Sequence, residues 1–409
     1  MSMDVVEAGQ FTVGERMEMR RRRRGLSRKV VAERVGRSEE WLRAVETGRR
    51  RLDSVEVIMR LADVLDIADP GELVDRPAQP VGKGRDSTGE LAALGRAVID
   101  HPALRIYEGH RDIEQIDAAS IAVALRRCSR VWTGSPRRYS ILAQRLPRVL
   151  TASRLIRWQR RDDETAELLI WAYHLARRLA TACGEHDLAA VVADRAMGTA
   201  AQLHRRSLVA ASAWHVGHAL VHRGQFREGH DYALSAARRL GADPPADGRE
   251  LTLWGALHLV AACAAIGARD LAESSRLVWI AERAAAESHS DAIVFGVPFG
   301  PVHLGITRVE IALARRDPTE ALRLAAEVDV PQDYPIGDRA RHHIRLARAY
   351  SEHGDEVAAA FALNKAVAIS PEDVCHDAAA RQCVEYLLAG HNPLIRHEVT
   401  RLSALMSGA

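Results

Sequence analysis

Among the side chains that could carry chemistry, three histidines lie closest together. His215, His218 and His222 follow one another at i, i+3 and i+7, so a helix would place them along one face. No Asp, Glu or Cys accompanies them in the surrounding sequence, although zinc sites usually combine such ligands. The chain also shows no Gly-rich phosphate loop in a suitable context, no nucleophile motif and no metalloprotease helix. We therefore expect no metal site, no cofactor and no enzymatic activity.

The cysteines point to a reducing environment. They are odd in number and scattered, without Cys-x-x-Cys spacing: Cys128, Cys183, Cys263, Cys375 and Cys383. Such a set predicts neither a disulfide framework nor a zinc site. The N-terminus lacks an apolar signal core, and we expect no run of the roughly 18 apolar residues that a membrane span needs. These features predict a cytoplasmic protein that does not associate with a membrane.

Positive charge is concentrated near the N-terminus. The formal net charge of the 409-residue chain is only +3, yet residues 16–51 contain fourteen Arg or Lys and five Glu. Such a local excess is typical of a surface that faces phosphates. It includes the five arginines of residues 20–24. Because successive helical residues point in different directions, we expect two or three of these five to contact phosphate.

The length and patterning indicate an all-α protein of two domains. A chain of 409 residues exceeds a single compact core, and its apolar residues recur at the three-and-four spacing of helices. We predict a compact unit over residues 1–75, a linker over 76–89 and a helical domain over 90–409. The linker is marked by residues that break helices: Pro77, Pro80, Gly82, Gly84, Ser87 and Gly89. Residues 90–162 are predicted to be helical but show no repeat.

Caps and turns define two consecutive short helices in the first unit. Ser27 is placed to cap a helix that ends at Gly36, and Ser38 to cap a second one that Gly48 ends. Asp53 followed by Glu56 resembles a capping box that opens a further helix to about residue 65. The apolar positions of the two short helices are spaced to face one another: Val31, Ala32, Val35, Leu42 and Val45.

Residues 11–68 resemble the phage-repressor type (Xre-like) helix-turn-helix family. The positions that carry this resemblance are Leu26, Ser27, Val31, Ala32, Gly36, Ser38, Leu42, Glu46 and Gly48. The resemblance implies a five-helix domain that binds double-stranded DNA and inserts its third helix, residues 38–47, into the major groove. Arg37 departs from the family, which usually has an apolar residue there.

The resemblance also implies a division of DNA contacts. Contacts at or near the bases carry over to Ser38, Glu39, Glu40, Arg43 and Ala44, and phosphate contacts to Arg28, Arg49, Arg50 and Arg51. An arginine at position 43 suits guanine, and a carboxylate at 39 or 40 suits the amino group of cytosine. The two glutamates have a competing interpretation, because negative charge in the first turn stabilises a helix through its dipole.

The second domain resembles a tetratricopeptide-repeat array. Its clearest unit, residues 341–371, carries the spacing of Ala347, Tyr350, Gly354, Ala359, Ala366 and Pro371. We place the turns of successive units at Gly184, Gly224, Gly267, about residue 316 and Gly354. These markers are 40, 43, 49 and 38 residues apart, more than the usual repeat of about 34 residues.

In such arrays the first helix of each pair lines a concave surface. The repeat positions imply these ligand-facing residues: Trp171, His174, Arg178, Trp214, His218, Trp254, His303, Glu310, Arg341 and Arg348. The three tryptophans could form a stacking surface for a ligand. The alternative is that each one fills the joint between long helices.

Together the two domains resemble the quorum-sensing regulators of Gram-positive bacteria. That resemblance implies a homodimer that binds DNA and senses a short peptide. Those regulators often hold peptide with asparagines, whereas this chain has only Asn364 and Asn392, so a small-molecule effector is the alternative. A protein-interaction scaffold that does not bind DNA is the competing function, favoured by Arg37 and the Glu39–Glu40 pair. The helices from Asp377 onward are expected to cap the array or to form the dimer.

Overall fold

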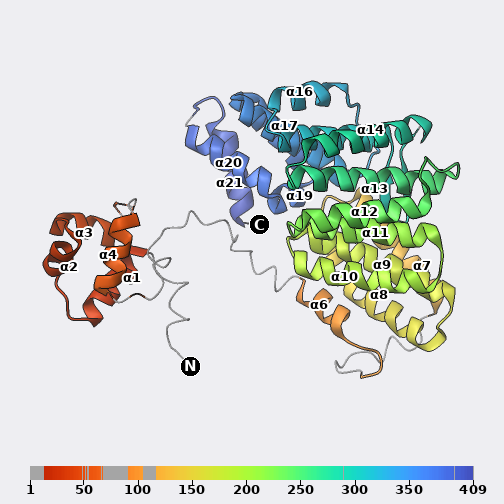
Figure 1. Cartoon of the computed structure of the whole chain (residues 1–409), viewed down its shortest axis with the longest axis horizontal. Helices are drawn as coiled ribbons and strands as arrows, with labels where there is room; N and C mark the ends of the chain where they lie inside the picture. Colours follow the sequence, from red (N-terminus) through yellow and green to blue (C-terminus); the bar gives the residue numbers. More distant parts are fainter. Residues whose placement is uncertain are drawn as a thin grey trace. The chain divides into compact units, whose positions relative to one another are not determined.

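The computed structural model describes residues 13–47, 49–50, 52, 55–65, 67, 91–104, 117–288, 290–390 and 392–408. The chain divides into two compact units, Met1–Asp86 and Ser87–Ala409, which Figure 1 colours by sequence. The division falls within the predicted linker, whose own residues lie outside those described.

The described part of the first unit consists of short helices around one small core. These are α1 (Val13–Arg23), α2 (Arg28–Val35), α3 (Glu39–Glu46) and α4 (Val55–Leu65). The five apolar residues predicted to face one another across α2 and α3 are all buried, together with Met17, Leu61 and Leu65. The fifth predicted helix and the Asp53–Glu56 capping box lie outside the described residues and side chains.

The predicted N-caps of α2 and α3 and the predicted end of α2 are confirmed, while Gly48 lies outside the described residues. The hydroxyl of Ser27 accepts a hydrogen bond from the backbone N–H of Val30, and that of Ser38 accepts one from Trp41. Gly36 ends α2 with φ 75°, a left-handed conformation that glycine adopts without steric cost. These local bonds fix the turn between the two helices and therefore the direction in which α3 leaves it.

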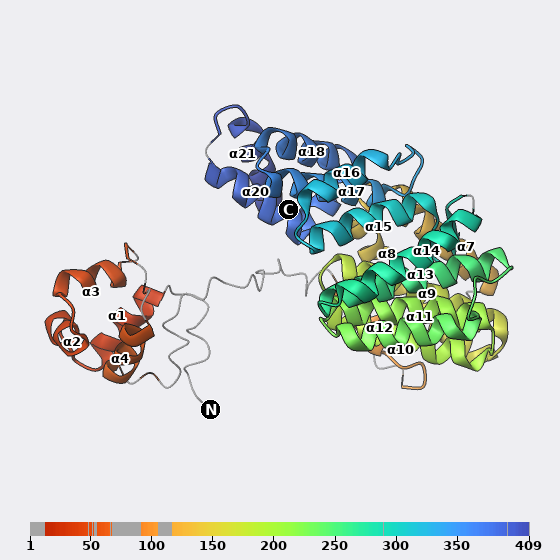
Figure 2. The same ribbon diagram turned by 45° about the horizontal axis from the view of Figure 1, so that its top comes forward.

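The second unit is a stack of antiparallel helices. Its helices are α6 (Ala92–Ile99), α7 (Ala118–Gly134), α8 (Arg138–Arg160), α9 (Asp163–Ala182), α10 (His186–Gln202), α11 (Arg206–His222), α12 (Phe226–Leu240), α13 (Gly248–Gly267), α14 (Leu271–Ser288), α15 (Pro301–Ala314), α16 (Pro318–Glu327), α17 (Ile336–His353), α18 (Glu356–Ile369), α19 (Pro371–His376), α20 (Ala378–Gly390) and α21 (Arg396–Gly408). Helices α9 to α18 form five consecutive pairs whose first members, α9, α11, α13, α15 and α17, pack against one another in turn. Figure 2 shows the pairs stacked into a helical solenoid.

The predicted turns fall between the members of these pairs, with one correction. Gly184, Gly224, Arg316 and Gly354 all have positive φ at the turn. Gly267 does not make the turn of its pair, since it lies inside α13 and the left-handed residue is Arg269, with φ 64°. A Cβ at position 267 would lie 2.2 Å from the ring of Phe226. This glycine is therefore required for close helix packing.

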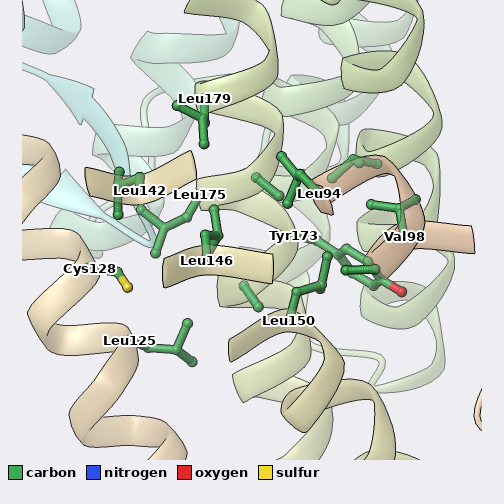
Figure 3. Close-up of a cluster of buried hydrophobic side chains, with 14 of the residues drawn as sticks. Leu94, Val98, Leu125, Cys128, Leu142, Leu146, Leu150, Tyr173, Leu175 and Leu179 are labelled. Atoms are coloured by element: carbon green, nitrogen blue, oxygen red, sulfur yellow. The ribbon is translucent and has the colours of Figure 1, made fainter. Parts of the chain in front are cut away.

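Helices α6, α7 and α8 close one end of the solenoid. Figure 3 shows leucines of these helices converging with Tyr173, Leu175 and Leu179 of α9, and all belong to one buried cluster. Cys128 of α7 lies in that cluster, and all five cysteines are free thiols. The segment without a repeat signature therefore packs as an extension of the array.

A β-hairpin interrupts the helices between α14 and α15. Strands β1 (Ala292–Val294) and β2 (Val297–Phe299) pair antiparallel, across a turn in which Phe295 and Gly296 both have positive φ. Two such residues suit the tight turn of a two-residue hairpin. The all-α prediction missed this element, which inserts the ring of Phe299 against Gly255 of α13.

Helix α13 is long and apolar enough, by length and composition, to cross a membrane. This helix corrects the expectation that the chain contains no segment long and apolar enough for a membrane span. Within the array, 78% of the apolar stretch of α13 is buried, because α11, α12 and α14 pack around this helix. A helix enclosed in this way needs no polar face.

Substituting Gly255 with Ala is expected to lower the free energy of unfolding of the second unit by about 1–3 kcal/mol, the usual cost of overpacking. A Cβ there would lie 2.1 Å from the fully buried ring of Phe299. Gly198→Ala in α10 is the matched control, because its Cβ would meet nothing within 4 Å and alanine favours a helix. Urea unfolding followed by circular dichroism measures both. Equal stabilities of the two variants would contradict this packing.

Candidate functional site

The exposed face of α3 carries the side chains predicted to face the bases. Glu39, Glu40 and Arg43 are exposed and Ala44 is half-buried, while Leu42 and Val45 point into the core. The hydroxyl of Ser38 caps the helix at Trp41, 3.1 Å away. Both glutamates lie in the first turn, so the structure is compatible with a base contact and with dipole stabilisation alike.

The loop after α3 extends this surface. Arg49 and Arg50 are exposed, and the backbone N–H of Arg50 bonds to the carbonyl of Ala44 at 3.0 Å. This bond holds the loop against the end of α3. Arg51, also predicted to contact phosphate, lies outside the described residues.

Arg28 has internal partners that the sequence analysis did not foresee. Its Nε donates to Glu46 Oε2 at 2.6 Å, and a terminal nitrogen donates to Glu18 at 3.2 Å. The hydrogen bond to Glu46 raises the pKa of the Arg28 guanidinium. The structure thus assigns this side chain to an internal network and does not leave it free for the phosphate contact that the family implies.

The same network includes one of the five consecutive arginines. Arg21 is 7% exposed and forms a two-pronged ion pair with Glu46, with distances of 2.6 and 3.2 Å. Arg22 instead pairs with Glu18 at the surface. Arg21 therefore stabilises the fold, and the predicted phosphate contacts of this run remain with its exposed members.

In the second unit, the first helices of the pairs surround a cavity of about 430 Å³. This volume lies within the usual range for ligand pockets, roughly 300–1,000 Å³. Seven of the ten residues that repeat positions predict to face a ligand line this cavity: Arg178, Trp214, His218, His303, Glu310, Arg341 and Arg348.

Three of the ten predicted residues do not line this cavity. Trp171 bonds through Nε1 to Ser129, and His174 is buried between Phe295 and Ser212. Trp254 is 3% exposed and bonds to the carbonyl of Gly241. The proposed stacking surface of three tryptophans is therefore wrong, because two of them fill joints between helices.

Other residues line the cavity from helices outside the repeat register. They come from α7, α8 and α19, and include Trp132, Arg138, Tyr139, Asp373 and His376. Repeat positions gave no signal for them, because the chain brings these helices to the cavity only in three dimensions. Arg345 could have been found, since it lies at the same helical face as Arg341 and Arg348.

Most of the arginines in the cavity have a carboxylate partner. Arg138 pairs with Asp373 and Arg341 with Asp338. Burial acts to raise the pKa of the Asp338 carboxyl, but Arg341 together with other nearby positive groups outweighs burial, and the net pKa is lowered. Two further pairs, Arg345 with Glu310 and Arg348 with Glu352, continue along the same side.

Several histidines in or beside the cavity are held neutral. Burial, opposed by a hydrogen bond to the Phe295 carbonyl, lowers the pKa of His174 to about 3. His218 lies over Trp214 with ring centroids 4.2 Å apart. No group of three metal-binding side chains occurs among the described residues.

A family profile and a solved structure match parts of this chain. Residues 12–76 match the sequence profile of a family described as a helix-turn-helix domain. A crystal structure of Bacillus thuringiensis PlcR in complex with the peptide PapR7 and DNA aligns with 68% of this chain and 96% of that one, at 12% identity. Its TM-score of 0.29 carries no argument about this chain. No curated protein matches the sequence.

Capped helices α2 and α3, a left-handed glycine between them and an exposed polar face on α3 agree with the match over residues 12–76. The N-terminal unit thus has a helix-turn-helix fold, and a helical solenoid follows it in the chain.

Proposed function

We propose that this protein is a cytoplasmic transcription regulator that binds a specific double-stranded DNA site as a homodimer. The observation that carries the proposal is the α3 surface, where Arg43, Arg49 and Arg50 are exposed and their side chains make no hydrogen bond or ion pair with other described residues. Arginines of this kind are suited to guanine and to phosphate oxygens. A dimer would read two half-sites related by a two-fold axis.

The solenoid would supply the sensing function. Its cavity is large enough for a small molecule or for part of a peptide, and we propose that an effector bound there changes the affinity for DNA. The C-terminal helices α20 and α21, with the loop between them, carry exposed apolar side chains, Tyr386, Leu388 and Leu394. Such side chains favour association and support these helices as the dimer contact.

The direct experiment is to select bound fragments from genomic DNA and then to titrate salt on the best site. A discrete, two-fold-related motif whose affinity falls steeply with salt is expected, because bound arginines release counterions from the phosphates. Binding without a preferred sequence, together with recovery of a stoichiometric protein partner, would favour the scaffold function instead.

Two variants separate sequence recognition from phosphate binding. Arg43→Ala is expected to cost about 1–3 kcal/mol on the selected site and to relax its sequence preference. Arg50→Ala is expected to weaken binding to all sequences alike and to reduce the salt dependence. Arg227→Ala, an exposed arginine of the solenoid, is the control for the change in charge. Wild-type affinity of both Arg43→Ala and Arg50→Ala would exclude this docking.

A further inference from the structure

Arg177 of α9 is a buried arginine without a carboxylate partner among the described residues. It is 4% exposed and lines the cavity. Its Nε donates to His215 Nδ1 at 2.9 Å, and its guanidinium lies over the ring of Trp214 at 5.1 Å. These contacts fix the plane of the guanidinium but do not compensate its charge. The two terminal nitrogens form no hydrogen bond within the described chain.

Arg178, the next residue, adds a second guanidinium to the same cavity. It donates to the carbonyl of Gly296 at 2.9 Å and lies over the ring of Trp132 at 4.8 Å. The carboxylate that acts on it is that of Asp338, which is already bound to Arg341 at 2.7 Å. Burial lowers the pKa of Arg178 to about 10, so the side chain remains charged at neutral pH.

The remaining charges of the cavity do not neutralise this pair. Its other arginines each have a carboxylate partner: Arg138 with Asp373, Arg341 with Asp338, Arg345 with Glu310 and Arg348 with Glu352. The neighbouring His215 and His218 are held neutral, since burial and nearby positive charge lower their pKa values. Asp377, the remaining carboxylate of the lining, accepts a hydrogen bond from the backbone N–H of Ala380 at 2.9 Å. Within the described residues, neither Arg177 nor Arg178 therefore has a carboxylate bound to its guanidinium.

Polar atoms without partners belong to residues that line the same cavity. Thr181 Oγ1, His186 Nδ1 and His303 Nδ1 are buried, belong to cavity-lining residues and form no hydrogen bond within the described structure. Thr181 follows Arg177 by four residues on α9, so both side chains lie on one helix face. Buried polar atoms are normally paired, so these three add unsatisfied polar groups to the surroundings of the two arginines.

An uncompensated buried charge is costly, and proteins retain one where a ligand of opposite charge balances it. The planar fork of a guanidinium matches the two oxygens of a carboxylate or phosphate. We propose that Arg177 and Arg178 bind the carboxylate or phosphate group of an organic anion in this cavity. The inference rests on the proposed effector role of the solenoid and gives that effector its chemical class.

The test is calorimetric titration of the full-length protein with inorganic phosphate and with succinate, at constant ionic strength set by chloride. We expect saturable binding of at least one of the two anions, and the preferred one identifies the head group. Arg177→Gln combined with Arg178→Gln is expected to weaken binding at least tenfold. Arg227→Gln is the matched control, because that arginine is exposed on α12 and does not line the cavity, and its affinity should stay within twofold of wild type.

Two results would overturn the proposal: heats in wild type no larger than those of a chloride titration, or wild-type affinity in the double variant. If the double variant fails to fold, as judged by circular dichroism, the single Arg178→Gln variant replaces it, since this side chain is only half-buried. A loss of affinity of at least threefold is then expected, and no loss would contradict the site.

These titrations contain no DNA, so their outcome is independent of the proposed function. Anion binding without sequence-specific DNA binding would leave the site intact and reject the regulator. Selection of a DNA motif without anion binding would support the regulator function and reject the anion site.

Discussion

Substituting Asp373 with Ala is expected to lower the free energy of unfolding of the second unit by about 3–5 kcal/mol, the cost of leaving a buried ion without its partner. Asp373 lies on α19 and accepts hydrogen bonds from Arg138 of α8, from the Tyr139 hydroxyl at 2.7 Å and from Ser370 at 2.6 Å. The side chains of Arg138 and Asp373 are each only 2% exposed. Without the carboxylate, the buried guanidinium would have no counter-charge.

This pair also holds the two ends of the solenoid together. Arg138 and Asp373 are 235 residues apart, and the neighbouring Glu372 accepts a hydrogen bond from the backbone N–H of Tyr139 at 2.7 Å. Loss of Asp373 is therefore expected to open the cavity wall that α8 and α19 share. Urea unfolding of the full chain measures the effect, with the exposed Asp243→Ala as the control, which should change stability by less than about 0.5 kcal/mol.

A double variant identifies the cause. In this variant Arg138 is replaced by Met and Asp373 by Leu, which removes both charges. The double variant is therefore expected to be markedly more stable than Asp373→Ala. A loss below about 1 kcal/mol for Asp373→Ala would show that the pair does not carry the stability assigned to it here.

Glu46→Ala is expected to destabilise the helix-turn-helix unit by about 3 kcal/mol. The Glu46 side chain is 1% exposed. It accepts a hydrogen bond of 2.6 Å from Arg21 and another of 2.6 Å from Arg28. Small domains have little stability in reserve, typically about 0.05–0.15 kcal/mol per residue. Removing the carboxylate leaves a buried and a half-buried arginine without their shared partner.

Hydrogen exchange of peptides from α2 and α3, measured by mass spectrometry in the full chain, reports this loss locally. Exchange through unfolding of the unit should become about a hundredfold faster, since 1.4 kcal/mol corresponds to a factor of about ten. Glu33→Ala, an exposed glutamate of α2, is the control and should leave the rates unchanged. Unchanged protection in Glu46→Ala would mean that the network contributes little.

Local features of the fold were predictable from the sequence. The caps at Ser27 and Ser38 and the glycine at position 36 act on residues within four positions of themselves, so the sequence contains the whole interaction. The turns at Gly184, Gly224 and Gly354 were predictable for the same reason. Repeat positions also predicted which face of the first helix of each pair is turned inward. Seven of the residues chosen in this way line the cavity.

The tertiary structure alone decided which charges meet. The sequence offers 57 Lys and Arg and 54 Asp and Glu, and nothing local selects Glu46 for Arg21 or Asp373 for Arg138. The sequence could not show that Gly267 packs against Phe226 instead of forming a turn. It also could not show that Trp171 and Trp254 fill the joints between helices. These outcomes depend on how closely helices distant in sequence approach one another, because Coulomb attraction, burial and steric exclusion act between neighbours in space. Arg177 and Arg178 were left without carboxylates by that same packing, which the order of residues along the chain does not specify.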